Sequence, residues 1–133
     1  MKRARLIVDG MNVIGSRPDR WWKDRTGAMR RLVRRLEDYA RAEDTQITVV
    51  FDSAPFDLAP PPGSGVLAVF ATPAARNAAD DEIVRIVESD AEPDSLQVVT
   101  SDAALAARVE ALGATVLTAG GFRNRLEEAA SET

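Results

Sequence analysis

The stretch LIVDGMNVIG, residues 6–15, decides the fold, because an apolar strand stops there at a carboxylate. Leu6, Ile7 and Val8 read as a buried strand, Asp9 follows at once, and Asn12 stands three residues later. A charge at the end of a buried strand is costly unless something binds it. In open α/β sheets, ligands bind beyond the C-terminal ends of the strands. The sequence therefore predicts a functional sheet edge at this point.

Apolar runs of strand length recur along the chain. They are continuous rather than alternating, which favours strands covered on both faces, as in a parallel sheet. The predicted strands are Leu6–Val8, Ile47–Phe51, Val66–Ala71, Leu96–Thr100 and Thr115–Leu117. Helical spacing between them predicts helices over about Gly27–Glu43, Asn77–Ser89 and Asp102–Gly113, and a short last helix, Phe122–Ala130, after the Gly120-Gly121 break. The stretch DLAPPPGSG, residues 57–65, is a predicted loop. This alternation predicts an α/β sandwich with a mostly parallel sheet.

The composition is typical of a globular chain. Of the 133 residues, 45% are hydrophobic and 29% are charged, and this length predicts one domain over residues 1–133. No apolar run is long enough for a membrane span, and the basic start at Lys2 and Arg3 lacks the apolar segment of a signal peptide. We therefore expect a cytoplasmic protein with no membrane partner.

The chain contains neither cysteine nor histidine. Their absence excludes disulfides, thiolate nucleophiles, cysteine-ligated zinc, the Ser-His-Asp triad and imidazole metal ligands. Any chemistry must rest on carboxylates, amides, hydroxyls, lysine and arginine, alone or with a hard metal ion.

The net charge of −4 is unevenly distributed. Residues 1–41 hold 12 lysines and arginines against 5 acidic residues, whereas residues 42–133 hold 5 against 16. Nucleic-acid binding by such a chain depends on where the basic side chains point rather than on the overall charge.

Polar or acidic side chains follow four of the predicted strands. Besides Asp9 and Asn12, they are Asp52 after the second strand, Ser101 and Asp102 after the fourth, and Asp80 and Asp81 in the helix that follows the third. Each has a structural explanation as well: Asn77, Ser101 or Asp102 can cap a helix, Asp80 can complete a capping box, and Asp52 can begin a turn before Pro55. Taken singly, Asp52, Asp81 and Ser101 are best explained in this way.

Asp9 and Asp80 indicate more than capping. Asp9 directly follows buried apolar residues, and no helical pattern begins there for it to cap. Asp80 shares the inward face of Ile83, Val84 and Val87, whereas Asp81 leans to the side. Carboxylates gathered at one edge repel and resist ionising together. A divalent cation removes that conflict, and an all-oxygen donor set suits Mg²⁺ or Mn²⁺.

Four motifs, in order, resemble the NYN domains, a branch of the PIN-like nucleases, and most closely the YacP-like subfamily. They are LIVDGMNVIG (6–15), VVFDS (49–53), NAADDEIVRIV (77–87) and VVTSDAALAARVEALGA (98–114). The resemblance implies a PIN-like three-layer sandwich with strand order 3-2-1-4-5. It also implies that Asp9, Asp80 and Asp102 bind metal for RNA cleavage. Asn12 is expected among the catalytic residues as a supporting ligand, and Asp81 as a further metal-binding residue, with Asp52 and Ser101 in support.

The resulting expectation is a metal-dependent endoribonuclease. One or two Mg²⁺ or Mn²⁺ ions on Asp9, Asp80 and Asp102 would bridge the scissile phosphate and activate water, leaving 5′-phosphate and 3′-hydroxyl ends. The chain departs from the subfamily pattern in one turn. A glutamate is common there before the helix that carries Asp80, but Ala74 or Ala75 takes its place, with Arg76 nearby. This loss would weaken metal binding or leave the metal with more water.

A basic and aromatic segment, SRPDRWWKDRTG (16–27), leaves the same strand end as Asp9 and should overhang the site. Indoles stack on unpaired bases, and lysine and arginine follow phosphates. The predicted RNA-binding residues are Arg17, Arg20, Trp21, Trp22, Lys23, Arg25 and Arg76, for single-stranded or ribosome-associated mRNA. At least one of the two tryptophans is expected to pack as core instead. Most of Arg30, Arg31, Arg34 and Arg35 are expected to form the solvated face of a helix.

Three rival functions remain to be weighed. A response-regulator receiver needs a lysine after the fifth strand, but the only lysines are Lys2 and Lys23. A haloacid-dehalogenase-like phosphatase needs a second aspartate two residues after the first, where Met11 stands. The third rival, which stays open, is a catalytically weak RNA- or ribosome-binding module on the same fold.

Overall fold

The computed structural model describes residues 4–16, 20–52, 58, 60–71 and 78–131. The strands are β1 (Ala4–Asp9), β2 (Thr45–Phe51), β3 (Val66–Phe70), β4 (Leu96–Val99) and β5 (Thr115–Leu117). The α-helices are α1 (Gly10–Gly15), α2 (Arg25–Glu43), α3 (Ala78–Ser89), α4 (Ala103–Ala111) and α5 (Ala119–Ser131), and two 3-10 turns are η1 (Trp21–Asp24) and η2 (Pro93–Ser95). The five predicted strands are confirmed to within two residues at each end.

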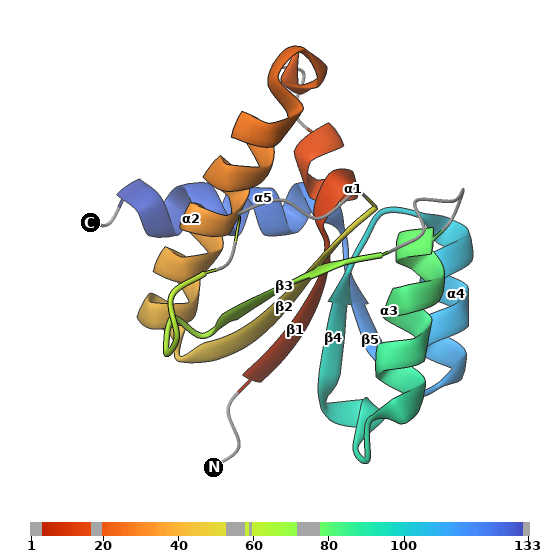
Figure 1. Ribbon diagram of the computed structural model, residues 1–133. Coiled ribbons are helices and arrows are strands. Elements are labelled where there is room, and N and C mark those ends of the chain that lie inside the picture. The colour runs from red at the N-terminus through yellow and green to blue at the C-terminus, as the bar shows by residue number, and fades with distance from the viewer. Residues whose placement is uncertain (1–3, 17–19, 53–57, 59, 72–77, 132–133) are drawn as a thin grey trace.

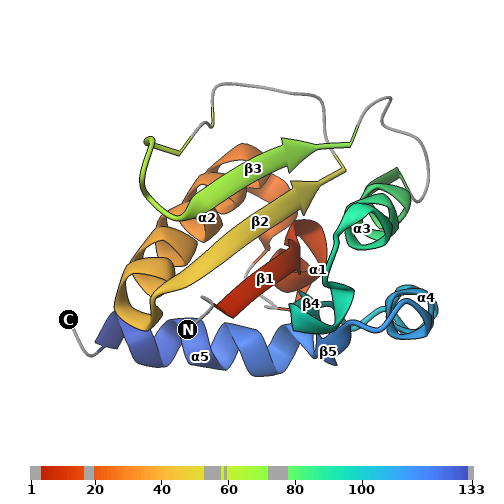
Figure 2. The same ribbon diagram turned by 90° about the horizontal axis from the view of Figure 1, so that it is seen from below.

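The strands form one sheet in the order β3-β2-β1-β4-β5, and every pairing is parallel (Figure 2). This is the order that the family resemblance implied. β1 lies at the centre, where Val8 is opposite Val49 of β2 and Val99 of β4. Because the strands are parallel, the residues that follow β1, β2 and β4 meet at one edge of the sheet.

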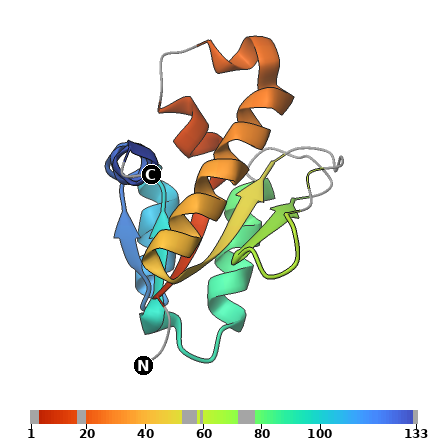
Figure 3. The ribbon, with the colours of Figure 1, turned by 90° about the vertical axis from the view of Figure 1, so that its left-hand side faces the viewer.

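Helices cover both faces of the sheet, with α1, α2 and α5 on one side and α3 and α4 on the other (Figure 1). Figure 3 looks onto α2 where it crosses the sheet, with α5, which it contacts, seen end-on. Leu6 and Val8 pack in the core beneath α2 and α5, whereas Ile7 packs in the core beneath α3 and α4. This alternation shows why the three consecutive residues in the middle of the central strand are all apolar.

The edge strand β3 differs from the expectation that both faces are covered. Four of its five side chains are half-buried, and the fifth, Leu67, is 60% exposed. The described residues between β2 and β3 contain no helix, in agreement with the predicted loop, and Leu58 packs into the core beneath α2.

A helix begins immediately after Asp9, contrary to the sequence expectation. α1 starts at Gly10, and Asp9 precedes it without a side-chain capping hydrogen bond. Gly10 permits the start of α1 to pack closely against β2, because a Cβ there would lie 2.5 Å from the Phe51 ring. The helix escaped prediction because it has six residues, with a glycine at each end.

The last helix begins earlier than predicted. α5 starts at Ala119 and includes Gly120 and Gly121, which the sequence indicated as a break. Two side chains compensate for the poor helix propensity of glycine: the Thr118 hydroxyl accepts from the Gly121 N–H at 3.1 Å, and Ser101 Oγ accepts from the Ala119 N–H at 2.9 Å.

The other helices follow the predicted spacing. α2 begins two residues early, where the Asp24 carboxylate accepts from the Gly27 N–H. α4 ends before Gly113, whose φ of +103° is left-handed and favours glycine. The predicted cap of α3 at Asn77 and the turn at Ser53 and Pro55 lie outside the described residues. No helix in the described ranges is both long and apolar enough to cross a membrane.

A candidate carboxylate site at the strand ends

Asp9 is a buried charge at the end of the central strand. It is 6% exposed, and its Oδ2 accepts a hydrogen bond from the Thr100 hydroxyl at 3.0 Å. The backbone N–H of Asn12 in α1 favours the ionised form of the Asp9 carboxylate. The Thr100 hydroxyl, just past β4, thus holds this side chain in place.

Burial raises the pKa of Asp9 from 3.8 to about 6. The hydrogen bond from Thr100 opposes the shift, whereas the nearby negative charges of Asp80 and Asp52 add to it. The carboxylate therefore lies in a site that favours either a proton or a cation beside it.

Asn12 joins α1 to the loop that follows β4. Its Oδ1 accepts from the Ser101 N–H at 2.7 Å. Ser101 in turn accepts from the start of α5, so α1, the β4–α4 loop and α5 form one connected unit. The structure thus gives Asn12 and Ser101 a positioning role at the Asp9 edge.

Asp80 lies in the first turn of α3, on the side of the helix that faces the sheet. Ile83 and Val87 on this side are fully buried, and Asp80 is half-buried, as the spacing predicted. Burial raises its pKa, and the neighbouring Asp102 carboxylate adds to the shift, which Arg108 opposes. Asp9 and Asp80 are therefore two acidic groups at one edge that each resist ionisation.

Asp102 caps α4. Its Oδ1 accepts from the N–H groups of Ala104 and Leu105, at 2.9 and 3.1 Å. Its own N–H donates to Thr100 Oγ1, the same hydroxyl that donates to Asp9. The capping explanation weighed from the sequence is therefore correct for Asp102, and Thr100 connects this residue to Asp9.

Two flanking aspartates form ion pairs. Asp81 Oδ1 lies 3.1 Å from Arg108 Nη1, and Asp52 Oδ1 lies 3.0 Å from Arg25 Nη2. All four side chains are more than 40% exposed, so each pair contributes at most about 1 kcal/mol to stability. Arg25 and Asp52, predicted for RNA binding and for support, thus contact one another.

The donor chemistry at this edge fits a hard divalent cation, because every candidate ligand is a carboxylate oxygen. Within the described ranges, however, no three acidic side chains are grouped closely enough to hold a metal ion among them. One Asp102 oxygen caps α4, and Asp81 turns to Arg108. Asp9 and Asp80 remain the two acidic groups committed to neither a helix cap nor a described ion pair.

The basic and aromatic segment divides into a buried and an exposed part. Trp21 is half-buried and packs on the core beneath α2, whereas Trp22 is 61% exposed and lies edge-on to it. The expectation that one tryptophan packs as core is therefore confirmed. Arg20 and Lys23 are exposed. Arg17 and Arg76, and the turn with Ala74 and Ala75, lie outside the described residues.

Sequence reasoning missed Thr100, the hydroxyl between Asp9 and Asp102. The signal was present in the register: Val8 pairs with Val99, so the next residues, Asp9 and Thr100, are neighbours on parallel strands. A hydroxyl one residue past a strand end is not distinctive before that pairing is known.

In a comparison with known families, residues 6–133 of this chain match the YacP-like NYN domain. The fold is also that of Rae1 (YacP) from Bacillus subtilis, with a TM-score of 0.79 and 21% identity over 99% of this chain and 77% of that one. A tryptophan-to-leucine mutant of the same protein gives a TM-score of 0.78 and 21% identity, covering 96% and 77% of the two chains. At this identity the two structures establish the fold alone. No curated protein matches the chain.

Proposed function

The chain belongs to the YacP-like NYN domain family, and from this premise we propose that it is a divalent-metal-dependent endoribonuclease acting on unpaired or ribosome-associated mRNA. The observation that carries the proposal is the buried Asp9 carboxylate at the end of the central strand, with Asp80 close enough to raise its pKa. Burying a carboxylate costs free energy, and a bound cation would offset that cost. A buried carboxylate at a strand end is therefore better explained as a metal ligand than as a purely structural residue.

The metal would be Mg²⁺ or Mn²⁺, held by Asp9 and Asp80, with Asp102 and Asp81 completing the acidic edge. Mg²⁺ usually keeps several waters and is bound through one or two carboxylates plus substrate phosphates, so an edge with two uncommitted aspartates fits it. The bound cation would supply positive charge to the phosphodiester and lower the pKa of a water.

The residues of the chain orient these groups. The Thr100 hydroxyl fixes the Asp9 carboxylate, and the Asn12 side chain fixes the loop that leads to Asp102. Binding of substrate or metal needs Asp9 ionised, and the pKa of about 6 leaves it mostly ionised at neutral pH. Trp22 and Lys23, both exposed on η1, would contact the incoming RNA strand.

A second candidate is a catalytically weak RNA-binding module. The commitment of Asp102 to the α4 cap and of Asp81 to Arg108 favours it, because fewer carboxylates then remain for a metal. The two candidates differ in one observable, which is RNA cleavage in the presence of metal. A nuclease cleaves RNA and loses this activity when Asp9 is neutralised, whereas a binding module binds RNA without cleaving it.

The test is cleavage of a labelled single-stranded RNA in EDTA, Mg²⁺ or Mn²⁺ by wild type, Asp9→Asn and Asp94→Asn. Asp94 is an exposed aspartate in η2, before β4, and is the matched control. We expect metal-dependent cleavage that leaves 5′-phosphate ends, a loss of at least about 100-fold in Asp9→Asn, and wild-type rates in Asp94→Asn. RNA binding without cleavage in any metal would favour the second candidate.

A further inference from the structure

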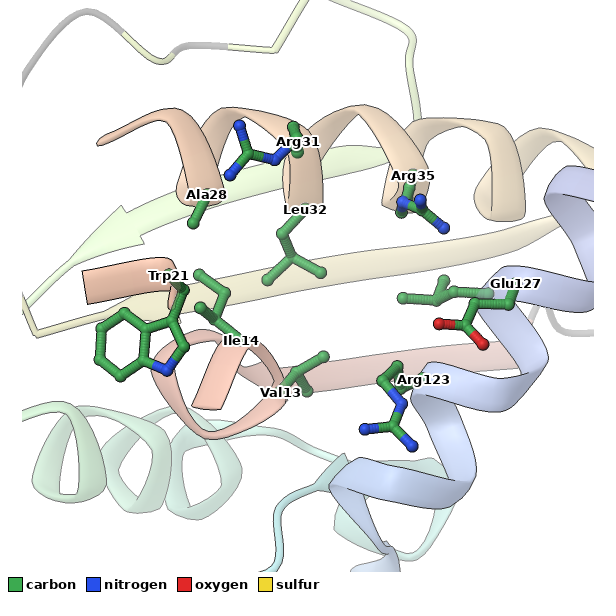
Figure 4. Close-up of a pocket in the computed structure, with 10 residues that line it drawn as sticks. Val13, Ile14, Trp21, Ala28, Arg31, Leu32, Arg35, Arg123 and Glu127 are labelled. Carbon is green, nitrogen blue, oxygen red and sulfur yellow. The ribbon is translucent and has the colours of Figure 1, made fainter. Parts of the chain in front are cut away.

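A pocket lies between α1, η1, α2 and α5, and none of the candidate carboxylates lines it (Figure 4). Its volume is about 120 Å³. This is well below the roughly 300–1,000 Å³ of sites for drug-sized ligands, so the pocket suits one small ring system. Its apolar wall consists of Val13, Ile14, Ala28, Leu32 and Leu126.

An indole closes one end of this pocket, opposite α5 (Figure 4). The Trp21 side chain packs partly on the core and lies beside Gly15, where a Cβ would be 3.9 Å from the ring. Trp21 belongs to η1 and lines the cavity. An aromatic wall beside aliphatic side chains suits a flat, apolar group.

The rim of the pocket is basic. Arg31 and Arg35 come from α2 and Arg123 from α5, against one carboxylate, Glu127 (Figure 4). The pocket lining thus carries three positive charges and one negative charge. The sequence suggested that the arginines of α2 are mostly a solvated face, but Arg35 is half-buried and lines the cavity.

Each of these arginines has guanidinium N–H donors that make no described contact. Arg123 donates to the backbone oxygen of Ser16 through one nitrogen. Arg31 is 58% exposed, and its described ion pair is long, with Asp24 at 4.0 Å. Arg35 makes no hydrogen bond or ion pair within the described part of the chain. A guanidinium carries five donors, so phosphate oxygens can be bound here without breaking the described contacts.

We infer that this pocket is a nucleotide-binding subsite, in which one base of an RNA strand lies against Trp21 and its phosphates contact Arg31, Arg35 and Arg123. The inference rests on the proposed function, because it extends the path of the RNA beyond the carboxylate edge. A nucleotide unit joins a flat ring to negative charge, as the apolar wall and basic rim require.

Helix α1 connects the subsite to the proposed site of cleavage. Asn12 on this helix faces the β4–α4 loop, whereas Val13 and Ile14, the next residues, line the pocket. Ser16, just past the helix, is held by Arg123. An RNA strand whose scissile phosphate lies at Asp9 would therefore place a nearby nucleotide at the pocket. Binding of that nucleotide in the pocket would determine which phosphodiester bond is cut.

The test compares two double variants of equal charge on α2. Arg31→Gln/Arg35→Gln removes two pocket arginines, and Arg30→Gln/Arg34→Gln removes the residues just before them in sequence, which do not line the pocket. Affinity for a labelled single-stranded RNA is measured in EDTA, so that the RNA stays intact. We expect the pocket pair to bind about tenfold more weakly than the control pair, and its salt slope to fall by about 1.4 as two phosphate contacts are lost.

A second measurement follows the pocket directly. Trp22→Phe leaves Trp21 as the single indole, and its emission should change on saturation with the same RNA. Unchanged emission would overturn the inference, even if the pocket pair proved unstable.

The outcomes separate this inference from the proposed function. Equal losses in both pairs would overturn the subsite and leave cleavage at the carboxylate edge unaffected. A selective loss in the pocket pair, in a protein that cuts no RNA with either metal, would retain the subsite and remove the nuclease assignment. Absence of RNA binding by the wild type would overturn both.

Discussion

Burial makes the Asp9 carboxylate harder to ionise than an ordinary aspartate, and this cost should appear in the stability of the protein. The pKa of Asp9 is about 6 in the folded state and ordinarily 3.8. Between these values the folded chain keeps a proton that the unfolded chain has lost. The free energy of unfolding must therefore fall as pH rises through this window.

We predict that Asp9→Asn removes this dependence. Relative to wild type, the free energy of unfolding of the variant should increase by about 2–3 kcal/mol between pH 4 and pH 7 in metal-free buffer. Asparagine can still accept from Thr100, so the described hydrogen bond is retained. Denaturant titrations at a series of pH values measure the difference. A constant difference across the window would mean that Asp9 is not perturbed by burial.

At the scale of the element, the start of α1 depends on one residue without a side chain. A Cβ on Gly10 would lie 2.5 Å from the buried Phe51 ring and 3.1 Å from Val49, whereas Gly120 in α5 has nothing within 4 Å. The same substitution should therefore act in opposite directions at the two positions.

Gly10→Ala is expected to destabilise the protein by about 1–3 kcal/mol through overpacking. Gly120→Ala is expected to stabilise it by roughly 0.5–1 kcal/mol, because alanine is the better helix former. Thermal unfolding of both variants measures these effects. A neutral Gly10→Ala would show that β2 can yield to α1.

Helix α3 supplies a second contrast, between adjacent aspartates. Asp80 lies on the face of the buried Ile83 and Val87, whereas Asp81 is exposed and pairs with Arg108. Asp80→Asn should abolish RNA cleavage, because a neutral amide does not supply the charge that holds a cation. Asp81→Asn should keep partial activity and lose at most about 1 kcal/mol of stability. If Asp81→Asn abolished cleavage and Asp80→Asn kept it, Asp81 rather than Asp80 would be the residue of the site.

A helix or strand could be predicted from the sequence when the interactions that form it are between residues close together in the chain. The strands and helices α2, α3 and α4 were predicted because their apolar periodicity is local. α1 and the start of α5 were not. α1 is short and ends in glycines, and the hydroxyls that begin α5 include Ser101, from a loop 18 residues away. The pocket was equally hidden, since Ile14, Arg35 and Arg123 meet only after folding.

At the scale of the whole molecule, a cation at the carboxylate edge would connect the central strand of the sheet to helix α3. Asp9 leaves the central strand and Asp80 belongs to α3, so a metal bound by both would stabilise the folded state alone. We predict that saturating Mg²⁺ or Mn²⁺ raises the melting temperature of wild type, by the equivalent of about 2.7 kcal/mol at 100 times the Kd.

Thermal scans with and without metal measure this effect. The shift should shrink below pH 6, where protons compete for Asp9, and should nearly vanish in Asp9→Asn while persisting in Asp94→Asn. An identical shift in wild type and Asp9→Asn would exclude Asp9 as a ligand.

The central place of β1 also has a consequence for biosynthesis. β1 ends at Asp9, but its neighbour β4 begins only at Leu96. At about 5–20 residues per second, a ribosome needs roughly 4–17 s to make the intervening chain. During that interval α2 and its arginines are synthesised, while the side of β1 that will pair with β4 has no partner. Asp80 and Asp102 arrive late, so a nascent chain presents its basic helix well before its acidic edge is complete.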